Sequence, residues 1–121
     1  MTTRAESIAT LASIRIIQLT TIGRKSGEPR PIEIWWFHVD GRFIITGLPG
    51  PRDWYANVLA HPDVEISTSI GTFTATAVPI DDVDVRRAVF TEPSVNWYAS
   101  RDGLDRLIET SPMVEVRLHL D

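Results

Sequence analysis

The sequence predicts a mainly β protein of the α+β class: a small antiparallel barrel of about six strands with short flanking helices. Three observations support this prediction. Short segments of alternating apolar and polar residues recur along the chain, glycine-containing turns join them, and only brief segments have helical spacing. Strands joined by tight turns pair antiparallel, whereas a parallel sheet needs a crossover connection between successive strands. A barrel is therefore favoured over a βαβ sheet.

The first half of the chain is expected to form one helix and three strands. Apolar residues at helical spacing come first, and the later segments are alternating or almost wholly apolar. Asp40 and Gly41 favour the positive φ angles of a tight hairpin turn. The expected elements are a helix over residues 5–14 and strands over residues 16–21, 32–39 and 42–46.

The second half is expected to add a second hairpin and three helices. Asp53 is placed to cap a helix that ends by His61, because Pro62 follows. Gly71 marks the turn of the hairpin, and Gly103 weakens the middle of the last helix. The expected elements are the helix that Asp53 caps, strands over residues 64–70 and 72–77, helices over residues 81–90 and 94–110, and a closing strand over residues 113–120.

Composition limits the classes of function. The 121 residues suffice for one domain, over residues 1–121, and the absence of cysteine excludes thiolate chemistry and disulfides. A net charge of -4 disfavours nucleic-acid binding, which needs a broad basic face. The three histidines are scattered, so no metal site is expected. No segment has the length of a membrane span or the pattern of a secretory signal, so we expect a cytoplasmic protein.

The strongest functional signal is the turn over residues 20–30, of sequence TTIGRKSGEPR. Its cations, Arg24, Lys25 and Arg30, lie within seven positions of an acidic protein. Cations, a serine hydroxyl and backbone N–H groups beside glycine are complementary to phosphate or carboxylate. The spacing matches neither a P-loop nor a nucleophile elbow. The turn therefore predicts an anion site, against the alternative of an ordinary solvated hairpin loop.

Three adjacent aromatic residues follow this turn, at positions 35–37. Successive side chains of a strand point to opposite faces, so at least one large ring lies on each face of the sheet. The outward ring needs a helix, a partner subunit or a planar ligand to cover it. An anion site beside a flat aromatic surface suits a phosphorylated ring system.

Three ordered motifs resemble the deazaflavin-dependent nitroreductase and quinone reductase family: residues 19–30, Asp40-Gly41-Arg42 and residues 54–62. The resemblance extends over residues 19–79 and implies a split β-barrel of the pyridoxamine-phosphate-oxidase type. It also implies that reduced coenzyme F-420 donates hydride to a small electron-poor acceptor such as a quinone, enone or nitroaromatic. Two alternatives stay open: a split-barrel oxidoreductase that holds flavin mononucleotide (FMN), and a non-catalytic carrier of a cofactor or acyl ligand. Monomer and homodimer are both compatible with the sequence.

The resemblance implies that the turn binds the phosphate and acidic tail of the coenzyme and that the next strand runs along its ring. We expect Asn57 to lie near the ligand and Trp54 to serve mainly in packing. Glu33 should pair with an arginine or face the site, with the pairing favoured. Tyr98 is a candidate proton donor to the substrate. The implied cofactor-binding residues are Gly23, Arg24, Lys25, Ser26, Gly27, Arg30, Ile32, Glu33, Ile34, Trp35, Arg52, Trp54 and Asn57.

Overall fold

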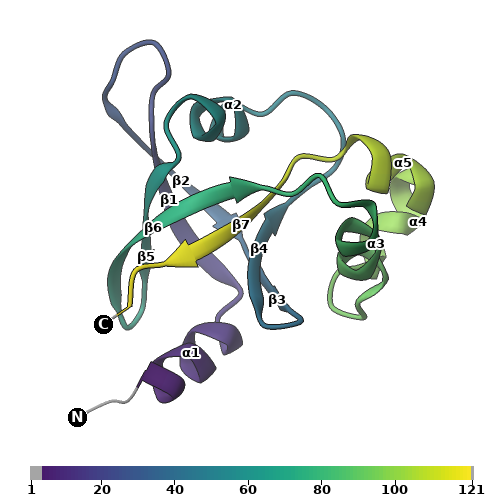
Figure 1. Cartoon of the computed structure of the whole chain (residues 1–121), viewed down its shortest axis with the longest axis horizontal. Coiled ribbons are helices and arrows are strands. Elements are labelled where there is room, and N and C mark those ends of the chain that lie inside the picture. Colours follow the sequence, from purple (N-terminus) through teal and green to yellow (C-terminus); the bar gives the residue numbers. More distant parts are fainter. Residues whose placement is uncertain (1–3, 121) are drawn as a thin grey trace.

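Seven antiparallel strands form one curled sheet in the computed structural model, which describes residues 4–120 (Figure 1). Their order across the sheet is β2-β1-β5-β6-β7-β4-β3. The two edge strands are therefore neighbours in the chain, as a barrel split between β2 and β3 requires. The strands are β1 (Ile16–Ile22), β2 (Pro29–Trp35), β3 (Phe37–Val39), β4 (Arg42–Thr46), β5 (Asp63–Thr68), β6 (Gly71–Pro79) and β7 (Met113–Leu118).

Helices lie around the sheet in three places (Figure 1). Helix α1 (Arg4–Ser13) lies at one end of the sheet and α2 (Asp53–Ala60) at the other, beside the turn that joins β1 to β2. The remaining helices gather on one side: α3 (Val83–Thr91), the 3-10 helix η1 (Asn96–Tyr98), α4 (Ala99–Asp102) and α5 (Leu104–Thr110). No helix within residues 4–120 is long and apolar enough to cross a membrane.

Two hydrophobic cores follow from the alternation of side chains along the strands. The first core joins inward residues of five strands to one face of α1 and of α2, with Leu19, Trp36 and Val58 almost fully buried. The second lies between β3, β4 and β7 and the helices α3 to α5, and includes Phe37 and Phe90. Trp36, which lies between β2 and β3, and Phe37, the first residue of β3, enter different cores.

The predicted hairpins are confirmed. Asp40 and Gly41 have φ angles of 51° and 79°, and Val39 pairs with Arg42 across the turn. Residues with two positive φ values form the turn whose twist matches that of antiparallel strands. β5 and β6 also pair antiparallel, from Asp63 opposite Thr76 to Thr68 opposite Gly71.

The structure corrects the extent of four predicted elements. The single strand expected over residues 32–39 is two strands, because the chain leaves β1 and pairs with β4 instead, with Trp36 donating its backbone N–H to Arg15 O between them. The strand count is therefore seven. The helix expected over residues 94–110 is divided into η1, α4 and α5, because Gly103 has a φ of 81° and leaves the helical conformation. The strands expected over residues 64–70 and 113–120 end at Thr68 and Leu118.

A buried arginine joins the helical layer to the sheet. The Arg86 guanidinium donates hydrogen bonds to the carbonyl oxygens of Ile80, Leu107, Ile108 and Ser111, at 2.5 to 3.4 Å. Three of these carbonyls belong to the end of α5, where a helix leaves its last carbonyls without internal partners. Burial lowers the pKa of Arg86 from its ordinary value, an effect opposed by Tyr55 and Asp81. Arg86 thus serves the fold.

Candidate functional site

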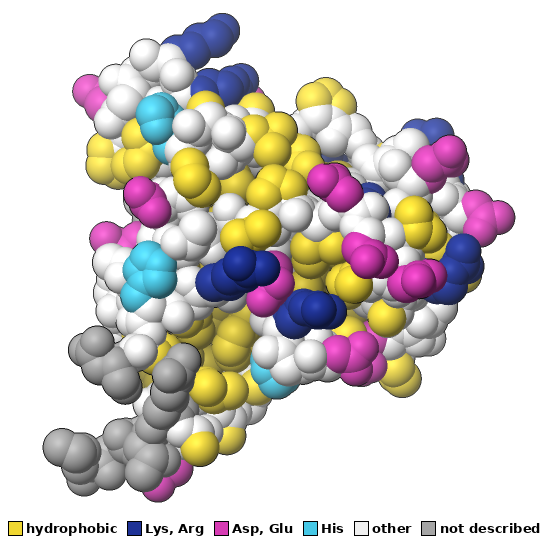
Figure 2. Space-filling view, viewed as in Figure 1, with side chains coloured by type: hydrophobic (Ala, Val, Ile, Leu, Met, Phe, Trp, Pro, Cys, Tyr) yellow, Lys and Arg dark blue, Asp and Glu magenta, His cyan; other side chains and the backbone are white. Residues whose placement is uncertain are grey.

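A cavity of about 500 Å³ lies at the end of the sheet where the β1–β2 turn meets α2. The turn contributes its three cations and α2 contributes one face of its first turns. In Figure 2, basic side chains lie at this end of the molecule and also over the middle of the visible face, whereas acidic side chains gather over the α3–α5 layer. The lining residues are Thr21, Gly23, Arg24, Lys25, Ser26, Pro29, Arg30, Pro31, Ile32, Asp53, Trp54 and Asn57.

Two glycines allow the turn to close tightly. Gly27 donates its backbone N–H to Gly23 O, and Gly23 donates to Glu28 O, both at 2.8 Å. Gly27 has a φ of 72°, a conformation that favours glycine. A Cβ atom on Gly23 would lie 2.5 Å from Ser26 Oγ, closer than real Cβ contacts permit. Any larger residue at position 23 would therefore displace the serine hydroxyl.

Asn57 fixes Arg24 against helix α2. Its Oδ1 atom accepts hydrogen bonds from the Arg24 backbone N–H at 3.1 Å and from Arg24 Nη1 at 2.9 Å. Its Nδ2 atom donates to Thr21 Oγ1 at 3.1 Å. Both Asn57 and Thr21 are buried. The amide therefore holds the turn, the strand and the helix together beside the cavity.

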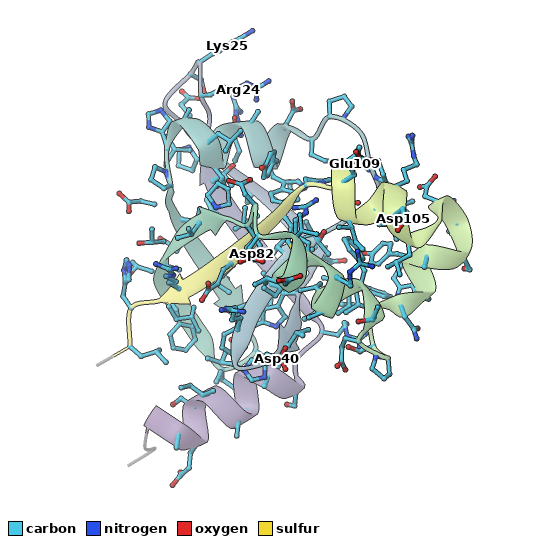
Figure 3. The ribbon with its side chains drawn as sticks, turned by 45° about the vertical axis from the view of Figure 1, so that its right-hand side comes forward. Arg24, Lys25, Asp40, Asp82, Asp105 and Glu109 are labelled. Atoms are coloured by element: carbon cyan, nitrogen blue, oxygen red, sulfur yellow. The ribbon has the colours of Figure 1, made fainter. Side chains whose placement is uncertain are left out.

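The other two cations differ in how they are held. Arg30 donates from Nη2 to Ser26 Oγ at 3.1 Å, and the same oxygen accepts the backbone N–H of Glu28. Lys25 makes no hydrogen bond or ion pair with any other residue in the described part of the chain, and Figure 3 shows it at the tip of the turn, extended into solvent. The site thus combines two guanidinium groups that are held by hydrogen bonds with one ammonium group that extends into solvent.

Charge at the cavity is positive overall. Its lining includes three cations and one carboxylate, Asp53, which lies 3.3 Å from Arg24 Nη2. Asp53 is not the helix cap that the sequence predicted: the cap position belongs to Arg52, no side chain caps this end, and Asp53 is the first residue of α2. Its carboxylate contacts the turn instead. A net excess of two cations suits an anionic ligand.

Apolar side chains form the rest of the cavity. Trp54 is 8% exposed and belongs to the first core, which confirms its expected role in packing, yet it also lines the cavity. Ile32 and the two prolines of β2 lie opposite, on an edge strand. The cavity therefore has a cationic end and an apolar flank, the arrangement that a ring system with a phosphate requires.

Comparison with known proteins identifies the family to which this chain belongs. The family model for F420H(2)-dependent quinone reductase matches residues 1–119. The chain belongs to this family. The family name specifies the reduced coenzyme F-420 as the electron donor. The cations and the close turn at Gly23, which are present in the structure independently of that name, fit a phosphorylated and acidic coenzyme.

Two curated members of the quinone reductase family illustrate the relation. Both are from Mycobacterium tuberculosis, strains CDC 1551 and H37Rv, and both bear the family's name. Each is 32% identical to this chain over 90 residues, which cover 68% of this chain and 60% of the relative. The match therefore spans about 60% of the length of these relatives.

Solved structures confirm the fold. A conserved protein from M. tuberculosis superposes with a TM-score of 0.74 at 17% identity, covering 99% of this chain and 82% of its own. A Listeria innocua protein assigned to the pyridoxamine 5'-phosphate oxidases gives 0.71 at 11% identity, covering 96% and 93%. An F420-H2 dependent reductase gives 0.62 at 23% identity, covering 85% and 94%. The predicted split barrel of the pyridoxamine-phosphate-oxidase type is thus confirmed.

Several residues that the family resemblance implied as cofactor-binding residues lie outside the cavity lining. Gly27 serves the turn, and Ile34 packs against the first core. Arg52 donates to Pro51 O and Leu48 O, within its own loop. Trp35 is 41% exposed and contacts Trp97, so a helical residue partly covers the outward ring. These contacts are structural in the protein as it stands, and a role for these residues beside the coenzyme stays a prediction.

The expected arginine pairing of Glu33 is wrong. Glu33 is exposed on edge strand β2, opposite Gln18, and forms no ion pair within residues 4–120. A carboxylate in an apolar strand costs little free energy when it is exposed to solvent, and the outer face of this edge strand is open to water. The apolar neighbours of Glu33 in sequence therefore misled the prediction.

The structure places Tyr98 in the second core. It is 8% exposed and packs against Phe37, Phe90 and Trp97. Burial raises the pKa of its hydroxyl, an effect opposed by Arg15. Tyr98 does not line the cavity, and proton donation from it stays a prediction.

Sequence reasoning missed four residues that line the cavity: Thr21, Pro29, Pro31 and Asp53. Thr21 and Pro29 lie inside the turn motif that predicted the site.

Proposed function

We propose that this chain is a reductase that binds reduced coenzyme F-420 in the cavity and reduces a small electron-poor molecule such as a quinone, enone or nitroaromatic. The observation that carries the proposal is the convergence of Arg24, Lys25 and Arg30 on one cavity, with both arginines held by hydrogen bonds. Positioned cations lose little side-chain freedom when an anion binds, so they bind it with less entropic cost. Family membership supports the choice of coenzyme.

Each group at the cavity then has a distinct role. Arg24 and Arg30 would hold the phosphate, since a guanidinium is a planar donor that suits phosphate oxygens. Lys25, at the tip of the turn, would reach the acidic tail. Ile32 and Trp54 would flank the ring and exclude water from one side of it. The bound coenzyme supplies the hydride, and the chain binds, orients and shields.

The test is a titration of the purified protein with the coenzyme, followed by the coenzyme's fluorescence. We expect a saturable change in wild type and about a tenfold weaker affinity in Lys25→Ala, the loss of one unscreened charge contact at low salt. Arg101→Ala is the matched control, because it removes an exposed cation from α4 that lies outside the cavity lining. No saturable change, or equal affinity in Lys25→Ala and wild type, would refute the proposal.

Lys25 permits a second and independent readout, because it is the only lysine in the sequence. Amine-directed acetylation followed by mass spectrometry reports on this residue and on the chain's amino terminus alone. Coenzyme binding should slow acetylation of Lys25 and leave the terminus unchanged as an internal control. Reduction of a panel of quinones, enones and nitroaromatics then tests turnover. A yellow protein that holds FMN, or tight coenzyme binding without turnover, would favour the alternatives.

A further inference from the structure

We propose that Asp53 is a built-in counter-ion of the anion site, which an anionic ligand must displace from Arg24 in order to bind. The proposal concerns the same cavity and rests on the proposed function for the identity of the natural ligand. It assigns to Asp53 a part in setting affinity, through the cation that it contacts. The evidence lies in the two different ways in which helix α2 holds Arg24.

Two residues one helical turn apart on α2 contact the same guanidinium group. Asn57 accepts from Nη1 at 2.9 Å, and Asp53 accepts from Nη2 at 3.3 Å. Residues four apart on a helix share one face, so both face the β1–β2 turn. Figure 3 shows the Arg24 side chain directed toward α2.

The two contacts differ in burial. Asn57 is 4% exposed, and its amide is also bonded to buried Thr21. The Asp53 side chain is 91% exposed, and the Arg24 side chain is 37% exposed. A buried hydrogen bond resists exchange because a lost partner leaves a desolvated group, whereas an exposed ion pair exchanges readily with water or with another anion. Asn57 therefore stays bonded to Arg24, while Asp53 can be replaced.

Asp53 does not cap helix α2, although as an acidic residue in the first turn it interacts favourably with the helix dipole. An aspartate at the start of a helix usually accepts backbone N–H groups, but no side chain caps α2. Its carboxylate instead lies on the cavity lining, as the only acidic group among residues that otherwise suit an anion. Arg24 Nη2 is thus occupied in the absence of ligand, and an incoming phosphate oxygen gains that donor only when the carboxylate gives it up.

The test is the affinity of Asp53→Asn for inorganic pyrophosphate and for the coenzyme, measured by calorimetry at low ionic strength. We expect binding about two- to fivefold tighter than in wild type, as the loss of a competing exposed ion pair implies. The gain should shrink as salt is raised. Glu28→Gln is the matched control, since Glu28 contributes only backbone atoms to the same turn and does not line the cavity. It should change affinity by less than Asp53→Asn.

A double variant separates direct displacement from general electrostatics. In an Arg24→Ala background Asp53 has no guanidinium to occupy, so Asp53→Asn should then give no gain. An equal gain with and without Arg24, or an equal gain from Glu28→Gln, would overturn the proposal. Thermal unfolding of each variant shows whether the fold is intact. An unfolded Arg24→Ala variant would be replaced by Arg24→Lys, in which the gain should be reduced.

The outcomes also distinguish this proposal from the proposed function. Pyrophosphate binding with the expected gain, but no binding of the coenzyme, would uphold the role of Asp53 and refute the proposed function. Coenzyme binding that Asp53→Asn leaves unchanged would do the reverse. Binding of neither ligand to wild type would overturn both.

Discussion

Replacement of Asn57 by leucine should weaken the fold and the anion site together. Leucine has the same number of side-chain heavy atoms as asparagine, with the same branching, but no polar atoms, so it removes the two bonds to Arg24 and the bond to Thr21. The buried Thr21 hydroxyl and the partly buried Arg24 backbone N–H then lose their partners. The perturbation therefore tests whether one buried amide joins stability to binding.

The magnitude follows from those three bonds. Two are neutral and contribute about 1 kcal/mol each, and the bond to the Arg24 guanidinium contributes about 2 kcal/mol. Burial of the leucine side chain offsets about 1 kcal/mol of this sum. The net loss of unfolding free energy should be about 3 kcal/mol, or a decrease in Tm of about 10 °C for a domain of this size. Affinity for pyrophosphate should decrease about tenfold, because Arg24 is no longer held in place.

Urea unfolding followed by circular dichroism measures the first effect, and calorimetric titration measures the second. Asn57→Asp separates the effect on stability from the effect on binding. It keeps the acceptor for Arg24, so it should lose less stability than Asn57→Leu, but its negative charge repels an anion and should still weaken binding. Asn96→Leu is the control, since Asn96 is exposed in η1 and should change stability by less than about 0.5 kcal/mol. An Asn57→Leu variant with wild-type stability and affinity would refute the reasoning.

Three further predictions concern single residues. Arg86→Met should lower the unfolding free energy by about 3 kcal/mol or more, measured in urea, because four carbonyls lose their donor; Arg86→Lys should not restore it, since one ammonium cannot reach all four. Gly23→Ala should weaken pyrophosphate binding by moving Ser26 Oγ off Arg30, while Gly47→Ala, where a Cβ meets nothing within 4 Å, should not. Tyr98 has a raised pKa, so the folded state holds its proton more tightly than the unfolded chain. The stability that the protonated Tyr98 contributes is intact below about pH 10 and is lost as pH rises through the folded pKa. When the pH is raised to about 11, the urea midpoint of Tyr98→Phe should therefore decrease less than that of wild type.

Features determined by neighbouring residues could be predicted from the sequence. The hairpin at Asp40-Gly41 depends on backbone preferences of those two residues, and the observed φ angles match them. The positive charge of the β1–β2 turn comes from its own residues, and its binding of an anion stays a prediction. The expectation that the adjacent aromatic residues 35–37 do not all share one face is met, since Trp36 and Phe37 enter different cores.

Features that depend on how distant segments meet could not be predicted in this way. Asn57 lies 33 positions from Arg24, and only the docking of α2 against the turn brings them together. The capping prediction for Asp53 used the local preference of aspartate, and the ion pair with Arg24 prevailed over it. The prediction for Glu33 assumed a covered strand, whereas sheet order makes β2 an edge. In each case the missing information was the identity of the neighbour in space.

Helix α2 explains why these distant contacts are nevertheless well defined. Trp54 and Val58 form one stripe of the helix and are buried in the first core, while Asp53 and Asn57 form the adjacent stripe and contact the turn. Residues in stripes on one rigid helix keep a fixed relation to each other. Packing of the core therefore sets the position of the groups that hold Arg24. The proposed anion site would derive its geometry from the hydrophobic core, and a core substitution such as Val58→Ala should weaken anion binding without touching the cavity lining.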